Sequence, residues 1–247
     1  MKRNIRLLIS YDGTDFAGWQ KQRDYRTVQG VLEEALASLH GTPTPLVGAG
    51  RTDSGVHATG QVGNFYSLKE NIEDGKFSEA INVRLPKDVR VLSSGVVPEG
   101  FHSKRDAKSR QYAYWIASSL LGAAHMSRYA WFLRRLPSLV ALNEMARVIC
   151  GSHDFTAFTA RGDASKSRIR SINHAVFLSR GPMLVFRIDG NAFLWKMVRS
   201  LLGTMVDLAL CGGSGREMKE ILNSRDRSEA GPTAPARGLF LTRVDYE

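Results

Sequence analysis

The chain has 247 residues, and 34 lysines and arginines against 24 aspartates and glutamates give a formal net charge of +10 at pH 7. This length allows one large domain or two small ones with a substantial core, and 43% hydrophobic residues exclude wholesale disorder. The excess of base indicates an anionic partner, with nucleic acid first and an acidic membrane surface second. A soluble protein that is merely basic is the alternative.

The first half of the chain alternates between predicted strands and helices. Residues 5–9 alternate between apolar and polar side chains, which predicts a strand that ends at Asp12. An apolar stripe with helical spacing covers residues 28–39, with Thr27 as the expected N-cap and Gly41 as the expected end of a helix. The other elements expected in this half are a short helix at 78–82 and strands at 62–66, 89–97 and 110–116.

The second half repeats this alternation. Its expected elements are a helix at 139–149 with Ser138 as N-cap, a hairpin of strands 174–178 and 183–188, a long apolar helix at 193–210, a short helix around 218–222 and a last strand at 239–244. This order predicts an α+β fold with a largely antiparallel sheet flanked by helices. A polar run at 103–110 suggests two domains, residues 1–105 and a more basic 106–247.

Cysteines, histidines and hydropathy exclude several classes of protein. Cys150 and Cys211 are too few for a disulfide scaffold and are expected to be reduced core thiols of a cytosolic protein. The six histidines are too widely spaced for a zinc motif, so no metal is expected. Asp12 interrupts the first apolar run too early for a signal peptide, and no run reaches the roughly 18 apolar residues of a membrane span.

The glycine-rich segment from Gly48 to Val62 carries the most informative chemistry. It lacks the Gly-Lys-Ser/Thr ending of a phosphate-binding loop, the third glycine of a dinucleotide fingerprint and the frame of a hydrolase nucleophile elbow. What remains is Arg51 two residues before Asp53. An arginine close by would keep the carboxylate ionised, and such a carboxylate in a protected pocket acts as a nucleophile or base. A surface loop with a fortuitous ion pair is the alternative.

The stretch Arg51-Thr52-Asp53-Ser54-Gly55-Val56-His57 resembles the nucleophile motif of the bacterial tRNA pseudouridine synthase A family. Six further blocks resemble that family, in family order over nearly the whole chain. The other blocks are Tyr11-Asp12-Gly13 with Gly18-Trp19-Gln20, Thr27-Val28-Gln29, Phe101-His102 with Arg110-x-Tyr112-x-Tyr114, His153-Asp154-Phe155-Thr156, Asn191-Ala192-Phe193-Leu194 to Met197-Val198-Arg199, and Thr233-Ala234-Pro235-Ala236 with Gly238-Leu239-Phe240-Leu241.

The resemblance implies a fold, an activity and a setting. The fold is the pseudouridine synthase fold, with two related subdomains and an active-site cleft between them. The activity is that of an RNA isomerase, of the intramolecular transferase class, which converts uridine to pseudouridine at positions 38, 39 and 40 of the tRNA anticodon stem-loop. The base is flipped out, detached, rotated and rejoined through carbon, without metal or other cofactor. The resemblance further implies a homodimer in the cytoplasm.

The resemblance also implies roles for individual residues. Asp53 is the nucleophile, Tyr112 stacks on the target base, Arg199 pairs with Asp53, and Arg51 faces the RNA. The alternatives are a core aromatic for Tyr112, a helix-surface arginine for Arg199 and a loop-bracing role for His57 and Gln61. Phe16 and Trp19 either line the cleft or belong to the core.

Two basic runs are expected to contact tRNA phosphates. The first consists of Lys104, Arg105, Lys108 and Arg110, and the second of Arg161, Lys166, Arg168 and Arg170. The residues implied as tRNA contacts are Phe101, His102, Lys104, Arg105, Lys166, Arg168 and Arg170. The chain departs from the family pattern at Lys104, where an arginine is expected, and at Trp195 and Lys196, where the family often has histidines. An RNA-binding protein without catalysis, and an enzyme with a different positional specificity, remain the competing hypotheses.

Overall fold

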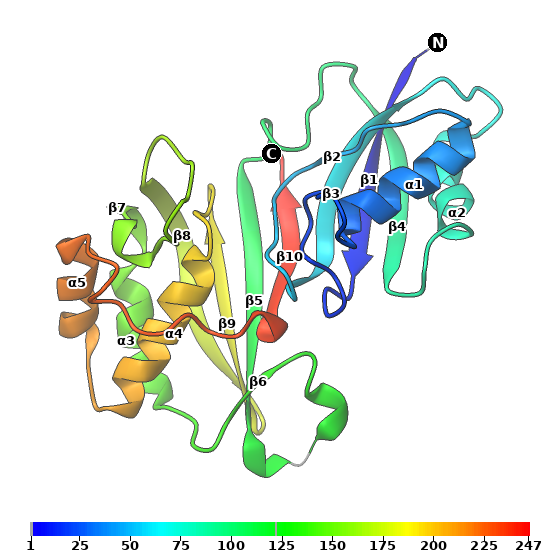
Figure 1. Ribbon diagram of the computed structural model, residues 1–247. Coiled ribbons are helices and arrows are strands. Elements are labelled where there is room, and N and C mark those ends of the chain that lie inside the picture. Colours follow the sequence, from blue (N-terminus) through cyan, green and yellow to red (C-terminus); the bar gives the residue numbers. More distant parts are fainter. Residues whose placement is uncertain (1, 122) are drawn as a thin grey trace. The chain divides into compact units, whose positions relative to one another are not determined.

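The computed structural model describes residues 2–121 and 123–247, and its contacts divide the chain into two compact units (Figure 1). The first unit contains the chain up to Lys108 together with Phe240–Glu247, and the second contains Ser109–Leu239. We expected a division between residues 105 and 106. The polar run at 103–110 could not show that the last residues belong to the first unit. Their place there depends on a strand that pairs with a partner far away in the sequence.

The first unit is built on a sheet in which β4, β1 and β3 are antiparallel and β10 runs parallel to β3. Its strands are β1 (Arg3–Tyr11), β2 (Val47–Gly48), β3 (His57–Ser67), β4 (Val89–Val97) and β10 (Leu239–Asp245). The short β2 pairs with β3. The strands expected at 5–9, 62–66, 89–97 and 239–244 are therefore confirmed, while β2 was not expected.

Two helices, α1 (Val28–His40) and α2 (Phe77–Asn82), pack against each other in the first unit, and the turn η1 (Asp74–Lys76) leads into α2. Both helices were predicted. The hydroxyl of Thr27 accepts the N–H of Gly30, and Gly41 ends α1 in the left-handed conformation at φ 76°. These are the capping contacts that the residue types indicate, and an N-cap of this kind stabilises a helix by about 1 kcal/mol.

In the second unit, neighbouring strands pair antiparallel in the order β5-β9-β8-β7, and β6 runs parallel to β5. The strands of this unit are β5 (Ser109–Ser118), β6 (Trp131–Leu133), β7 (Gly151–Asp154), β8 (Ile169–Arg180) and β9 (Met183–Gly190). The predicted hairpin is present as β8 and β9, whereas β6 and β7 were not expected. Short 3₁₀ turns are η2 (Ser119–Leu121), η3 (Ala124–Met126), η4 (Thr156–Phe158) and η5 (Ala236–Gly238).

Three helices accompany this sheet: α3 (Leu139–Val148), α4 (Met197–Leu210) and α5 (Gly215–Ser224). They pack against one another, and α3 also packs against β8 (Figure 1). Each unit thus combines a mostly antiparallel sheet with helices, and the predicted α+β class is confirmed. The expectation of two core thiols is wrong, because Cys211 is exposed and Cys150 is only partly buried; both are free.

The start of the long helix was also predicted wrongly. Its apolar pattern suggested a helix from residue 193, but α4 begins at Met197. The backbone of Trp195 is bonded instead to the preceding loop: its N–H donates to the Asp163 carboxylate and its carbonyl accepts the N–H of Ala160. Lys196 then adopts the left-handed conformation at φ 61°, so a helix cannot extend backward through this residue.

Candidate active site

Asp53 lies in the loop that joins β2 to β3, and contacts on each side fix the backbone of this loop. Before it, the carbonyl of Thr52 accepts the N–H of Trp19 at 3.1 Å, and the Thr52 hydroxyl lies 2.8 Å from the hydroxyl of Tyr11. After it, the N–H of Val56 donates to the carbonyl of Asp53 at 3.2 Å. Asp53 itself is partly buried. The carboxylate therefore extends from a fixed turn and is not sealed inside the core.

Two glycines allow the segment after β1 to lie close to the backbone of the Asp53 loop. A Cβ atom on Gly13 would lie 2.0 Å from the carbonyl oxygen of Val56, and one on Gly18 would lie 2.8 Å from that of Thr52. Gly18 also has φ of 100°, a backbone conformation that residues with a side chain rarely adopt. The glycines in this family block are thus needed to pack two backbones against each other around Asp53.

His57 and Gln61 brace the same loop. The Nδ1 atom of His57 accepts the N–H of Gly13 at 3.0 Å, and its ring, 1% exposed, stacks on Phe240 with centroids 4.6 Å apart. The amide of Gln61 donates to the carbonyl of Gly50 at 2.9 Å. These contacts correspond to the loop-bracing alternative.

The other residues of the first unit that were considered for the site, two aromatics and Arg51, differ in their exposure. Phe16 and Trp19 are each 2% exposed, so they belong to the core rather than to a surface that substrate reaches. Arg51, in contrast, is exposed.

The other two predicted site residues belong to the second unit. Tyr112 lies on β5, is 8% exposed and meets Phe193 edge to face at 5.2 Å. Arg199 lies in the first turn of α4, and its Nε donates to the carbonyl of Ala234 at 2.8 Å. Ala234 in turn donates its N–H to the carbonyl of Arg199 at 3.0 Å, so the two residues are fixed to each other.

Tyr114, two residues after Tyr112, is a buried donor beside Arg199. Its hydroxyl donates to the carbonyl of Pro235 at 2.7 Å, and its side chain is fully buried. Burial raises the pKa of Tyr114 far above its ordinary value, and the charges of Arg199 and Arg237 offset only part of that rise. The phenol therefore stays protonated and keeps its hydrogen bond at physiological pH.

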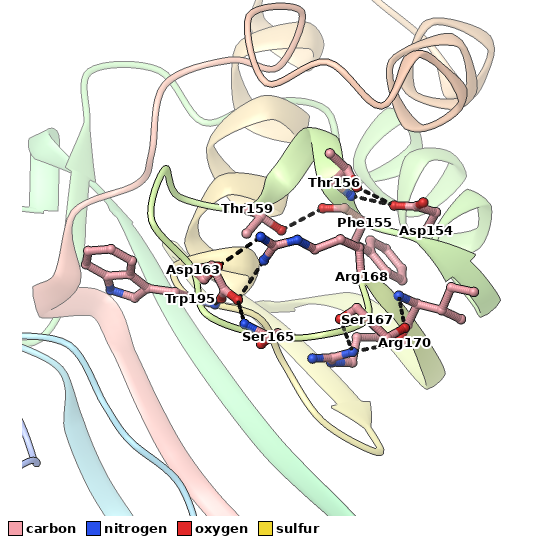
Figure 2. Close-up of polar contacts among 11 residues, drawn as sticks. Asp154, Phe155, Thr156, Thr159, Asp163, Ser165, Ser167, Arg168, Arg170 and Trp195 are labelled. Atoms are coloured by element: carbon pink, nitrogen blue, oxygen red, sulfur yellow. Dashed lines mark hydrogen bonds and ion pairs between the residues drawn. The ribbon is translucent and has the colours of Figure 1, made fainter.

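The sequence did not indicate Asp163, which organises a polar cluster in the second unit (Figure 2). Its side chain is 5% exposed. One carboxylate oxygen accepts from Arg168 at 2.6 Å and from the N–H of Ser165 at 2.7 Å, and the other accepts the N–H of Trp195 at 2.6 Å. An aspartate whose carboxylate accepts the backbone N–H two residues later is typical of a turn. Asp163 and Ser165 could have predicted this turn, although the basic residues around them indicated only RNA contacts.

Hydrogen bonds keep this carboxylate ionised. Burial acts to raise the pKa of Asp163, but the N–H of Trp195, the bonds to Ser165 and the charge of Arg168 outweigh it and lower the pKa to about 2. The guanidinium of Arg168 also donates to the carbonyl of Asp163 at 2.9 Å. Arg168 is therefore the structural partner of Asp163.

The basic residues predicted to contact tRNA have different surroundings. Arg170 donates to the carbonyls of Ser167 and Ile169, so it too bonds its own loop, whereas Lys166 is exposed. Phosphate contacts by Arg168 and Arg170 remain a prediction. In such contacts a phosphate would share each guanidinium group with the intramolecular acceptors that it already bonds.

The basic run of the first unit begins in an ordered turn. The Nδ1 atom of His102 accepts the backbone N–H groups of Lys104 and Arg105, at 3.2 and 3.3 Å. The carbonyl of Phe101 accepts from the amide of Asn4 at 2.8 Å. Lys104 and Arg105 are themselves exposed. His102 thus shapes the turn that presents two cations.

Neither a metal centre nor a membrane span appears in the part of the chain that the structure describes. Among these residues, no group of three or more His, Cys, Asp and Glu side chains is arranged to hold a metal ion. No helix there is long and apolar enough to cross a membrane.

Comparison with known proteins identifies the family. The family model for tRNA pseudouridine synthases matches residues 7–104 and 145–247. Proteins named tRNA pseudouridine synthase A are similar over nearly their full length. The one from Treponema denticola is 47% identical over 99% of this chain and 93% of its own, and the one from Acetivibrio thermocellus is 37% identical over 99% and 100%. The chain therefore belongs to the tRNA pseudouridine synthase family.

One solved structure, of a Cbf5-Nop10-Gar1 complex, aligns with 96% of this chain and 57% of that chain at 12% identity. Its TM-score of 0.39 is too low to add to the assignment, which rests on the sequence relatives.

Proposed function

We propose that this protein isomerises uridine to pseudouridine at positions 38, 39 and 40 of the tRNA anticodon stem-loop, with Asp53 as the nucleophile. The bond from the ring nitrogen to the ribose breaks, the base rotates, and a ring carbon bonds to the ribose instead. That carbon loses its hydrogen as a proton, and the freed nitrogen gains one. The product has the same formula and oxidation state as the substrate, so the reaction needs no oxidant, reductant or energy source.

The way in which Asp53 is held supports this proposal most directly. It lies within Arg51–His57, the block that resembles the family's nucleophile motif, on a backbone that Thr52 and Val56 fix on either side. The carboxylate is only partly buried. A preformed turn orients the carboxylate before substrate arrives, which lowers the entropic part of the barrier. Attack on the ribose, attack on the base and assistance to proton removal are all compatible with this placement.

The other roles in the proposed mechanism follow the family motifs. Because a stacked uridine is out of reach of any side chain, the target base must flip out of the RNA. Tyr112 would stack on that base, Arg199 would pair with Asp53, and Arg51 would take the place of the base or hold a phosphate. The remaining RNA contacts would come from the exposed cations of the two basic runs, Lys104, Arg105 and Lys166, and from Phe101, His102, Arg168 and Arg170.

The proposed setting is a homodimer in the cytoplasm. Both cysteines are free thiols, as expected in a reducing compartment. The homodimer follows from the resemblance, and sedimentation of the variants described below measures it.

Substitution of Asp53 tests the proposal. Asp53→Asn keeps the shape of the side chain and removes its charge, so it should bind tRNA like the parent but lose at least about a thousandfold in rate, as nucleophile substitutions do. The measurement is release of tritium from tRNA labelled in its uracil rings. Asp24→Asn, at an exposed position whose side chain is 86% exposed, serves as the matched control and should leave the rate unchanged.

Each outcome is informative. Substantial tritium release by Asp53→Asn would contradict the nucleophile assignment. Tight RNA binding by the parent protein without tritium release would instead support the competing hypothesis of an RNA-binding protein without catalysis.

A further inference from the structure

Trp195 is a large aromatic side chain held at the surface. It is 47% exposed, whereas Trp19 is 2% exposed. It lies in the stretch where the sequence predicted helix and the structure has an irregular segment before α4. A single exposed apolar residue is ordinary in itself. This one is distinguished by the way its backbone is fixed and by the charges near it.

The backbone of Trp195 is fixed on both sides. Its N–H donates to the buried carboxylate of Asp163 at 2.6 Å, and its carbonyl accepts the N–H of Ala160 at 3.0 Å. Arg168 holds that carboxylate from the other side (Figure 2). In the same view the indole points away from the pair formed by Asp163 and Arg168. The cluster therefore fixes the backbone of Trp195 and leaves the ring outside it, so this backbone needs no further ordering when a ligand contacts the ring.

One cation lies beside this ring, and two others lie on the neighbouring loop. The ammonium group of Lys196 lies 5.1 Å from the centroid of the Trp195 ring, and Arg161 and Lys166 are exposed on the loop that holds it. The acid of that loop, Asp163, is paired internally. Over the whole second unit, residues 109–239 carry 18 lysines and arginines against nine aspartates and glutamates. A flat apolar ring within a positive field suits a nucleobase with its phosphates.

We infer that Trp195 is a stacking platform for an unpaired nucleobase of the RNA substrate, with Lys196, Arg161 and Lys166 facing the adjacent phosphates. The identity of the RNA rests on the proposed function, whereas the stacking contact itself does not. A second copy of this chain is a less suitable occupant, because two strongly basic surfaces would repel each other.

Direct binding tests the inference. Each variant is measured in an Asp53→Asn background, which prevents turnover, against an anticodon stem-loop RNA at fixed salt. Trp195→Ala should weaken binding about tenfold, as loss of one stacked base does, and Trp195→Phe should recover most of the affinity because a ring is restored. Val140→Ala, at an apolar residue of the same unit that is 70% exposed, is the control and should bind like its parent.

Two further readouts separate stacking from charge. RNA should quench the tryptophan fluorescence of the parent protein, and Trp195→Phe should lose the larger part of that quenching. Lys196→Ala should lower the salt slope of binding by about one, whereas Trp195→Ala should weaken binding and leave the slope unchanged.

The outcomes distinguish this inference from the proposed function. Unchanged RNA affinity in Trp195→Ala would overturn the inference, and so would unchanged affinity accompanied by a change from dimer to monomer in sedimentation, which would assign the ring to a protein interface. Binding that depends on Trp195, combined with an absence of tritium release by the parent protein with Asp53 intact, would contradict the proposed function and leave the stacking platform in place.

Discussion

At the scale of single residues, Asp163 has a stronger structural influence than its place in a basic run suggests. Its carboxylate joins Arg168, Ser165 and the backbone of Trp195, and no local pattern in the sequence predicts a bond over 32 residues. By contrast, Asp53 was identified because a short motif carries it. Local motifs can be recognised in a sequence, whereas partners from different loops become visible only in the folded chain.

The lowered pKa of Asp163 makes its contribution to stability depend on pH. The folded pKa of about 2 lies below the ordinary 3.8, so the folded chain retains the charge where the unfolded chain binds a proton. This difference stabilises the fold by about 2 kcal/mol above roughly pH 5, and the contribution is lost as pH falls toward 2.

Asp163→Asn should therefore destabilise the protein by about 2 kcal/mol at pH 7 and by roughly half as much at pH 3. Urea unfolding of the parent and the variant at both values measures this difference. An equal destabilisation at the two pH values would show that the charge of Asp163 has no stabilising role.

At the scale of elements, the caps and periodic faces were predictable and the long-range contacts were not. Thr27 begins α1 and Gly41 ends it through contacts within a few residues, so the sequence indicates both ends of the helix. The start of α4 depends on Asp163, and the pairing of β10 with β3 joins Phe240 to His57, which lie far apart in the sequence. The same limit applies to the loop of Asp53. Its motif and the segment after β1 could each be recognised in the sequence, but the packing of one backbone against the other could not.

Gly13→Ala tests whether that segment positions the Asp53 loop. The added methyl group would lie 2.0 Å from the carbonyl oxygen of Val56, so the two backbones must separate. We expect a loss of about 1–3 kcal/mol in stability and a fall of at least about tenfold in the rate of tritium release, with RNA affinity close to that of the parent.

Gly75→Ala is the matched control, because nothing lies within 4 Å of its added Cβ atom. If Gly13→Ala retained full activity while Gly75→Ala behaved as expected, the segment after β1 would not determine the position of Asp53.

At the scale of the whole molecule, the charge belongs almost entirely to the second unit. The first unit carries 16 basic and 15 acidic side chains, against 18 and nine in the second. The sequence predicted a more basic second half, but assigning the last residues to the first unit sharpens the contrast. The positive field therefore resides in one unit and the proposed nucleophile in the other.

This asymmetry predicts a strong and uneven salt dependence of RNA binding. Affinity should fall on the order of a hundredfold or more between roughly 50 and 200 mM salt. Lys166→Gln in the second unit should lower the salt slope by about one, and Lys87→Gln, an exposed residue of the first unit, should leave it unchanged. Equal effects of both substitutions in a binding titration would show that RNA docking does not favour the second unit.

The measurement that tests the central claim most directly is site-resolved mapping of pseudouridine in an unmodified tRNA after incubation with the purified protein. We expect pseudouridine at positions 38, 39 and 40 wherever the tRNA has uridine there, and none after incubation with Asp53→Asn. An anticodon stem-loop left unmodified by the folded, RNA-binding parent protein, or modified equally by the Asp53→Asn variant, would contradict the proposed function.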